Sequence, residues 1–274
     1  MLQLVAIDLD DTLLSPDGSI SDRSKLVIRQ IREAGVLVTL ATGRMFRAAQ
    51  PFAEELGLDL PLITYQGALI KTAVSGEVWR RASLSAAQLY PLLEALEQYD
   101  VHINLYVEDD LYVAEMNQIA ADYARLSRVP VHPVGRLSRW STEEATKVVA
   151  IGEPDFLRDR LQPRMKELFP DLKINRSRPH FLEFGNSAAT KASALAYLGE
   201  RLDIRREQML AIGDSENDLD MIEYAGVGIA MGNSDPAVLA TADHITGTNA
   251  EDGVALALEH YFSSLLMSRR GDLE

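Results

Sequence analysis

The chain has 274 residues, with 27 Lys or Arg against 41 Asp or Glu, and its formal net charge is −14 at pH 7. It contains no cysteine, which excludes disulfides, thiolate nucleophiles and cysteine-ligated metal centres. The negative charge, with no local basic patch, argues against nucleic-acid binding, and no apolar run approaches the roughly 18 residues of a membrane span. Because the first residues also lack the basic region of a signal peptide, we expect a cytoplasmic protein.

The N-terminal part alternates short apolar runs with amphipathic helices. Ser21 is a good helix N-cap, and Gly35 stands where the C′ residue of that helix belongs. Strands are predicted at 4–7, 36–41 and 61–65, and helices at about 21–35 and 44–57. This alternation predicts right-handed crossovers and a parallel sheet.

The middle of the chain has a different pattern. Here we predict a hairpin near 75–76, helices at 85–99 and 154–169, and strands at 101–107, 111–115, 147–152, 172–177 and 180–184. The strand at 101–107 places apolar side chains on one face and His102, Asn104 and Tyr106 on the other. That alternation is typical of an antiparallel α+β module whose sheet has one covered face.

From residue 190 the first pattern returns, with helices at 190–202, from 216 and at 252–261, and strands at 209–212 and 227–231. We therefore predict an α/β fold with a doubly wound, mostly parallel, Rossmann-like core sheet. The core would comprise 1–83 and 186–274, interrupted by an inserted α+β domain at 84–185.

Two acidic loops follow buried strands of the predicted core. Asp8 and Asp10 follow the first strand, and Asp214, Asn217 and Asp218 follow the strand at 209–212. Ligand sites in open α/β sheets lie at the carboxyl ends of the strands, and side chains two apart on an extended chain point the same way. The loops could together form an oxygen-rich Mg²⁺ site. A solvated turn explains the first loop alone equally well, whereas helix capping, the alternative for the second, does not require Gly-Asp in front and Asn-Asp behind.

Two further positions suit phosphate. Thr42 and Gly43 join a strand to a helix, where a hydroxyl and free backbone N–H groups can hold an anion. Lys191 opens a helix, where a cation is unfavourable unless an anion or carboxylate lies opposite. Considered alone, a structural Thr-Gly junction and a surface lysine are the simpler interpretations.

In this order, the four stretches resemble the motifs of the haloacid dehalogenase (HAD) superfamily, and more closely its Cof-type, class IIB phosphatases with a C2-type cap. The matches are Asp8-Leu9-Asp10-Asp11-Thr12-Leu13, Thr42 in Ala-Thr-Gly-Arg, Lys191, and Gly213-Asp214-Ser215-Glu216-Asn217-Asp218. The resemblance covers nearly the whole chain. Two departures bear on substrate details: Gln66-Gly67-Ala68 replaces the usual Asn-Gly-Ala, and Thr190 precedes the lysine where the family often has Ser.

The resemblance implies a Mg²⁺-dependent phosphatase for small phosphorylated metabolites, of the sugar phosphate, FMN or pyridoxal phosphate class. Asp8 would be the nucleophile that forms an aspartyl-phosphate, and Asp10 the general acid and base. Metal ligands would be Asp8, the Asp10 carbonyl and Asp214, with Asn217 and Asp218 as further ligands or supports. Phosphate oxygens would be held by Thr42, Gly43 and Lys191.

Other functions fit the same residues. A phosphomutase would share the aspartyl-phosphate, a receiver-type phosphoacceptor would use clustered aspartates in a shorter chain, and a non-catalytic protein could bind phospho-ligands on this fold. In the inserted domain we expect His102, Asn104, Tyr106, Arg176, Arg178 and His180 either to contact substrate or to form a solvated sheet face.

Overall fold

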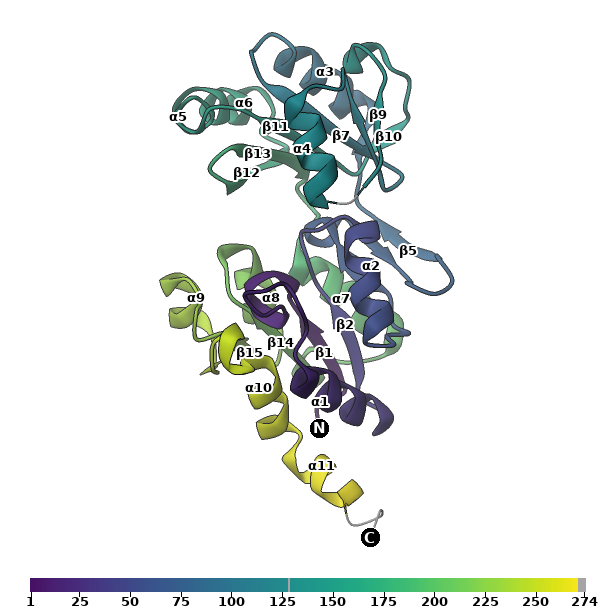
Figure 1. The fold of residues 1–274 in the computed structure, drawn as a ribbon, viewed down its shortest axis with the longest axis vertical. Helices are drawn as coiled ribbons and strands as arrows, with labels where there is room; N and C mark the ends of the chain where they lie inside the picture. Colours follow the sequence, from purple (N-terminus) through teal and green to yellow (C-terminus); the bar gives the residue numbers. More distant parts are fainter. Residues whose placement is uncertain (128, 271–274) are drawn as a thin grey trace. The chain divides into compact units, whose positions relative to one another are not determined.

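The computed structural model describes residues 1–127 and 129–270, which divide into two compact units (Figure 1). Unit 1 comprises Met1–Arg44, Ala49–Trp79 and the chain from Thr190 onward. Unit 2 comprises Met45–Ala48 and Arg80–Ala189. Within the described residues, no helix combines the length and apolar character needed to cross a bilayer.

Unit 1 is built on a five-stranded parallel sheet in the order β16-β15-β14-β1-β2. Its strands are β1 (Leu4–Ile7), β2 (Leu37–Leu40), β14 (Met209–Gly213), β15 (Val227–Ala230) and β16 (His244–Ile245). All four residues of β1 are fully buried, because β14 and β2 flank the strand and helices cover the sheet. The continuous apolar run at 4–7 is therefore the pattern of a strand buried on both faces, and the predicted α/β fold is confirmed.

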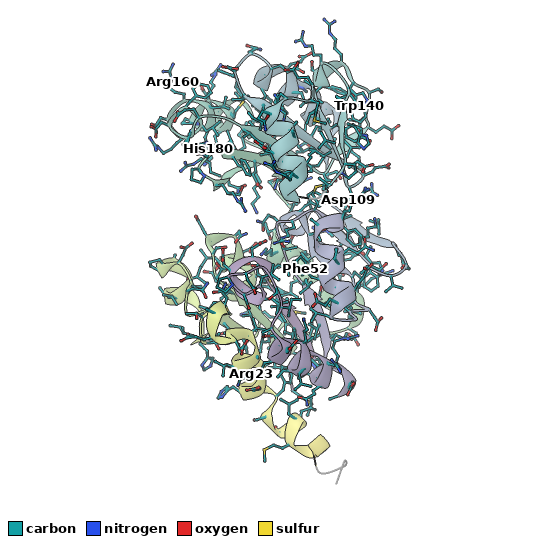
Figure 2. All side chains as sticks on the ribbon, viewed as in Figure 1. Arg23, Phe52, Asp109, Trp140, Arg160 and His180 are labelled. Carbon is teal, nitrogen blue, oxygen red and sulfur yellow. The ribbon has the colours of Figure 1, made fainter. Side chains whose placement is uncertain are left out.

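The helices of unit 1 begin and end at recognisable signals. They are α1 (Asp22–Glu33), α2 (Phe46–Glu55), α7 (Lys191–Leu202), α8 (Leu219–Tyr224), α9 (Pro236–Thr241), α10 (Gly253–Tyr261) and α11 (Ser263–Arg270), with short turns η1 (Leu9–Leu13), η2 (Tyr65–Gly67), η5 (Arg206–Gln208), η6 (Glu216–Asp218) and η7 (Asn249–Glu251). The Ser21 side chain caps α1 by accepting from the Ser24 N–H, and Gly35 follows the helix with φ +93°, as predicted. The side chains of Figure 2 include Arg23 on α1 and Phe52 on α2.

The strand predicted at 61–65 behaves differently from a third parallel strand. As β3 (Leu62–Thr64) it pairs antiparallel with β4 (Leu69–Lys71), which neighbours β5 (Val78–Arg81). Its link to the main sheet is an isolated parallel bridge between Ala41 and Ile63. The reason is the turn η2, where Tyr65, Gln66 and Gly67 all have positive φ and reverse the chain at once.

Unit 2 contains a six-stranded sheet in the order β12-β13-β11-β7-β8-β9, antiparallel except for the β8–β9 pair. Its strands are β7 (His102–Val107), β8 (Asp110–Val113), β9 (Val131–Pro133), β11 (Lys147–Ile151), β12 (Leu172–Arg178) and β13 (Phe181–Asn186). A short ladder joins β6 (Leu84–Ser85) to β10 (Glu144–Ala145). The helices are α3 (Ala86–Leu96), α4 (Gln118–Ser127), α5 (Pro154–Phe156) and α6 (Gln162–Leu168), with turns η3 (Leu137–Arg139) and η4 (Leu157–Leu161).

Both faces of this second sheet are covered at β7. On one face Ile103, Leu105 and Val107 join an apolar core with α3 and α6. On the other, Asn104 and Tyr106 are buried as well, with exposed fractions of 0% and 1%. The predicted single covered face is therefore wrong: α4, which is not among the predicted helices, packs on β7, and the Tyr106 hydroxyl donates to that of Tyr123 at 2.6 Å.

Candidate active site

Asp8 lies at the carboxyl end of β1, in the centre of the parallel sheet. Its backbone N–H donates to the Ile212 carbonyl at 3.0 Å, so the residue continues the ladder with β14. The side chain is almost fully buried, whereas that of Asp10 is 51% exposed. The two carboxylates do not converge as predicted, because residues 9–13 form the wide turn η1 and the alternation of an extended chain does not apply.

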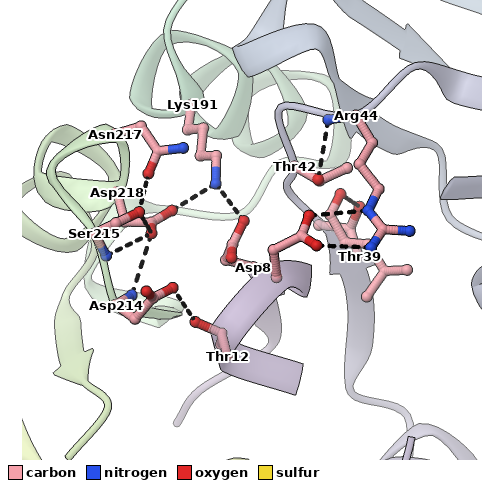
Figure 3. A network of polar contacts seen from close by, with 12 residues as sticks. Asp8, Thr12, Thr39, Thr42, Arg44, Lys191, Asp214, Ser215, Asn217 and Asp218 are labelled. Atoms are coloured by element: carbon pink, nitrogen blue, oxygen red, sulfur yellow. Dashed lines mark hydrogen bonds and ion pairs between the residues drawn. The ribbon is translucent and has the colours of Figure 1, made fainter. Parts of the chain in front are cut away.

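Lys191, the first residue of α7, reaches into the buried end of β1. Its Nζ donates to Asp8 Oδ1 and to Asp218 Oδ1, each at 2.5 Å, and the residue is only 1% exposed (Figure 3). The interpretation as a surface lysine is therefore wrong. Burial by itself lowers the pKa of Lys191, but the two carboxylates, Asp218 and then Asp8, outweigh burial and raise it above its usual value.

Asp214 and Asp218 reach the same place from the loop after β14. Asp214 accepts a hydrogen bond from Thr12 Oγ1 at 2.8 Å, and Asp218 Oδ2 accepts from the backbone N–H groups of Asp214 and Ser215 at 3.2 and 3.1 Å. One carboxylate oxygen each from Asp8, Asp214 and Asp218 lies within 4.8 Å of the others. The structure thus brings together three of the predicted acidic residues.

The electrostatics of this carboxylate cluster are unbalanced. Three carboxylates face the single ammonium of Lys191, so two negative charges lack a partner within the cluster. Burial, followed by repulsion from Asp218, raises the pKa of Asp8 well above its usual value, and burial raises the pKa of Asp214 to about 7. Hard oxygen donors with excess negative charge suit Mg²⁺, so the residues present fit such a cation.

Asn217 and the carboxylate of Asp10 lie apart from the cluster. Asn217 is exposed, and its Oδ1 accepts a hydrogen bond from the Ser215 hydroxyl. The Asp10 carboxylate accepts two bonds from Arg44. Their predicted roles toward a metal stay predictions.

The loop after β2 places Thr42 and Gly43 at the same edge of the sheet. Thr42 is fully buried, and its Oγ1 accepts from the Arg44 N–H at 3.1 Å. Its carbonyl accepts from the Gln66 N–H at 3.0 Å, and a Cβ at Gly43 would lie 2.5 Å from Gln66 Nε2. The longer amide of Gln66, a departure from the family motif, therefore fills the space beside Gly43.

The turn η2 also contacts the start of α7. A Cβ at Gly67 would lie 2.1 Å from the Thr190 carbonyl oxygen, a backbone atom, and Gly67 has φ +94°. Only glycine fits there. Thr190 in turn caps α7 by accepting from the Ser193 N–H at 3.0 Å, so this packing helps to set where Lys191 begins the helix.

The sequence analysis assigned no role to Thr12, Arg44 or Gln66. All three lie inside or beside the quoted motifs, and this proximity is the sequence feature that could have marked them as site residues. Their partners could not be read from the sequence, because each contact joins segments that only the fold brings together.

An acidic centre at the carboxyl edge of a doubly wound parallel sheet, with a lysine reaching it from a later helix, is the architecture expected of a phosphoryl-transfer hydrolase. The haloacid dehalogenase-like hydrolase family model matches residues 5–258. The chain therefore belongs to this family.

Comparison with known relatives shows which kind of hydrolase this is. The chain is 32% identical over 267 residues to the 5-amino-6-(5-phospho-D-ribitylamino)uracil phosphatase YitU of Bacillus subtilis, covering 95% of this chain and 97% of the relative. It is 28% identical over 262 residues to the pyridoxal phosphate phosphatase YbhA of Escherichia coli, covering 92% and 96%. A crystal structure of a haloacid dehalogenase-like hydrolase from Bacteroides thetaiotaomicron matches with a TM-score of 0.87 and 30% identity, covering 96% of this chain and all of that one. The chain is a HAD-type phosphatase of the Cof-type branch.

Proposed function

We propose that the chain is a Mg²⁺-dependent phosphatase that hydrolyses small phosphorylated metabolites through an aspartyl-phosphate on Asp8. The observation that carries the proposal is the buried Asp8 carboxylate, paired with Lys191 beside two further carboxylates. A buried carboxylate with an ammonium neighbour is a positioned nucleophile beside a fixed positive charge for an incoming phosphate.

In the first step an Asp8 oxygen attacks phosphorus in line with the leaving group. The new O–P bond forms as the ester P–O bond breaks, and the bonding electrons go to the ester oxygen. Asp10 donates its proton to that oxygen, so a neutral alcohol leaves. The product is an aspartyl-phosphate on the enzyme.

In the second step Asp10, now a carboxylate, takes a proton from water. The water oxygen bonds to phosphorus, and the bond between phosphorus and Asp8 breaks. Inorganic phosphate is released, the Asp8 carboxylate is restored and Asp10 again holds a proton. The two steps together consume the phosphate ester and one water and release the alcohol and inorganic phosphate, so the reaction is hydrolysis.

Mg²⁺ would be held by Asp8, the Asp10 carbonyl and Asp214, with Asn217 and Asp218 as further ligands or supports. When bound, it offsets the repulsion between an anionic nucleophile and an anionic phosphate. Thr42, Gly43 and Lys191 would hold the phosphate oxygens: the hydroxyl and backbone N–H groups as donors and the ammonium as a charge.

We further propose that an inserted cap at 84–185, which falls within the Arg80–Ala189 segment of unit 2, selects the leaving group. Asn104 and Tyr106 are buried beneath α4, so the exposed Arg176, Arg178 and His180 are the better candidates for substrate contact among the six polar residues first considered. The named substrates of YitU and YbhA support the class of small phosphorylated metabolites, which includes sugar phosphates, FMN and pyridoxal phosphate.

The test is phosphate release from a panel of sugar phosphates, FMN, pyridoxal phosphate and nucleotides, with Mg²⁺ or with chelator. We expect Mg²⁺-dependent release and, after rapid quenching, a phosphoryl mass increment located on Asp8. Isomerised substrate without phosphate release would indicate a phosphomutase. Binding of the panel compounds without turnover would indicate a phospho-ligand binding protein.

A further inference from the structure

A two-point ion pair engages Asp10. Arg44 Nε donates to one carboxylate oxygen at 2.9 Å, and a terminal guanidinium nitrogen donates to the other at 2.6 Å. The Asp10 side chain is 51% exposed and that of Arg44 31% exposed. A solvent-exposed pair contributes little to stability in general, so a stabilising role does not account for this geometry, which instead fixes the plane of the carboxylate.

Arg44 is itself held in place by contacts with Thr42, Tyr65 and Phe52. Its N–H donates to Thr42 Oγ1, its carbonyl accepts from the Tyr65 N–H at 2.9 Å, and its guanidinium lies 5.1 Å from the centre of the Phe52 ring. The pair with Asp10 raises the pKa of Arg44, which therefore stays charged. The guanidinium is thus a fixed point to which the exposed Asp10 side chain attaches.

The same contacts tie Arg44 to the phosphate-holding loop. The Thr42 hydroxyl accepts a hydrogen bond from the Arg44 N–H, and the Thr42 carbonyl accepts one from the Gln66 N–H. The position of the Asp10 carboxylate is consequently set by the loop proposed to hold the phosphate, and not by η1 alone. Asp10 must transfer its proton to the leaving-group oxygen, and this step is faster when its carboxyl is held at a fixed position relative to the phosphate.

We propose that Arg44 is a positioning residue for Asp10: it orients the acid/base carboxylate toward the leaving-group oxygen. This inference rests on the proposed function, in which Asp10 protonates the leaving alcohol. A carboxyl that donates a proton must carry it on one oxygen, so one of the two bonds to Arg44 opens while the other keeps the group in place. Arg44 touches neither phosphorus nor nucleophile in this role.

The test is a double-mutant cycle of Arg44→Ala and Asp10→Asn, measured as kcat/KM. This quantity covers the steps through release of the first product, so it isolates protonation of the leaving group from the second step. For an alkyl phosphate hydrolysed in the panel, pyridoxal phosphate or glucose 6-phosphate, we expect Arg44→Ala to lower kcat/KM by about 10- to 100-fold. In the Asp10→Asn background, Arg44→Ala should change kcat/KM by less than about twofold, because Arg44 then has no acid/base carboxylate to position.

Leaving-group dependence gives a second readout. With p-nitrophenyl phosphate, whose leaving group needs little protonation, Arg44→Ala should cost about threefold or less. Arg44→Lys, which keeps the charge but cannot make the two-point contact, should fall between wild type and Arg44→Ala. Because Arg44→Lys also retains much of the side chain, it completes the cycle if Arg44→Ala fails to fold.

The matched control is Arg23→Ala, which removes a similar two-point pair, with Glu259, at 3.0 and 2.6 Å on the surface of α1. It should leave kcat/KM within about twofold of wild type on both substrates. Equal losses for Arg44→Ala with and without Asp10, or equal losses on alkyl and aryl phosphates, would overturn the inference. A wild type that is inactive across the panel, or as active as Asp8→Asn, would instead overturn the proposed function.

Discussion

Each unit of the molecule buries a cluster of charged side chains, and the two clusters differ in charge balance. In unit 1 three carboxylates, Asp8, Asp214 and Asp218, lie together, and the ammonium of Lys191 pairs with Asp8 and Asp218. In unit 2 the ammonium of Lys147 meets one carboxylate, Glu183, at 2.6 Å.

The charges of the second cluster balance each other. Glu183 also accepts from the Ser177 hydroxyl at 2.5 Å, and Lys147 lies 6.0 Å from the centre of the Tyr106 ring. One positive charge meets one negative charge on a sheet face, so this cluster needs nothing further. The first cluster holds excess negative charge, which is costly in a buried site until it is paired, so its oxygen donors suit a cation. The difference indicates that balance, more than burial, distinguishes a ligand site from a structural ion pair.

The largest expected effect tests the chemistry of the unbalanced cluster. Asp8→Asn should lower kcat by at least about 10³-fold, since an amide cannot act as the nucleophile. The fold should remain intact, because Lys191 keeps its bond to Asp218. Steady-state kinetics and thermal unfolding measure both effects.

Asp11→Asn is the matched control for that substitution. Asp11 is exposed in the same turn, and asparagine tolerates its φ of 57°. Activity within about twofold of wild type is expected, since surface substitutions of this kind are usually mild. Residual turnover in Asp8→Asn comparable to that of Asp11→Asn would contradict the role of Asp8.

The next effect concerns the lysine that partly balances the first cluster. Lys191→Met removes the ammonium and leaves buried carboxylates facing one another, so the free energy of unfolding should fall by about 3–5 kcal/mol. Urea denaturation in the presence of chelator measures this. Added Mg²⁺ should restore part of the loss by binding the folded state, and a loss below about 1 kcal/mol would show that the cluster tolerates its charge.

The pH dependence of stability follows from the raised pKa of Asp214. Its folded value of about 7 lies above the ordinary 3.8, so between these values the folded protein binds this proton more tightly than the unfolded chain does. The contribution of Asp214 to stability therefore falls as pH rises from about 4 to about 7.

The thermal midpoint of metal-free protein measures that fall. The decline should be shallower in Asp214→Asn, and also with Mg²⁺, because the cation favours the ionised carboxylates. Identical slopes for wild type and Asp214→Asn would show that Asp214 contributes nothing to the pH dependence.

The smallest effect is expected in the balanced cluster. Lys147→Met should lower the free energy of unfolding by about 1–2 kcal/mol, because Glu183 keeps its bond to Ser177 and its side chain is 11% exposed. Mg²⁺ should not restore this loss. If Lys147→Met cost as much as Lys191→Met, or if Mg²⁺ rescued it, the contrast between the two clusters would fail.

Local pattern was enough to predict much of this protein. Buried apolar runs at 4–7 and 209–212 identified the central strands, and turn and capping residues such as Ser21 and Gly35 marked helix ends. The acidic loops after those strands could also be located, since the carboxyl edge of a parallel sheet is a property of the fold class. These features depend on residues close together in the sequence.

Local pattern failed where a contact joins distant segments. The alternation of 101–107 predicted a solvated face, but α4 covers it and buries Tyr106. The extended-chain argument placed Asp10 beside Asp8, but a turn directs it to Arg44, 34 residues away.

The sequence alone therefore determined the α/β alternation, the acidic loops at the strand ends and the resemblance to the HAD phosphatases, because periodicity, motif residues and motif order can all be read along the chain without knowing its contacts. The tertiary structure alone decided which of the many carboxylates share a buried space. Lys191 and Asp8 are 183 positions apart, and only the packing of α7 against the central sheet makes them neighbours. Charge balance in a buried site is a sum over such neighbours, so no reading of one segment at a time could determine it.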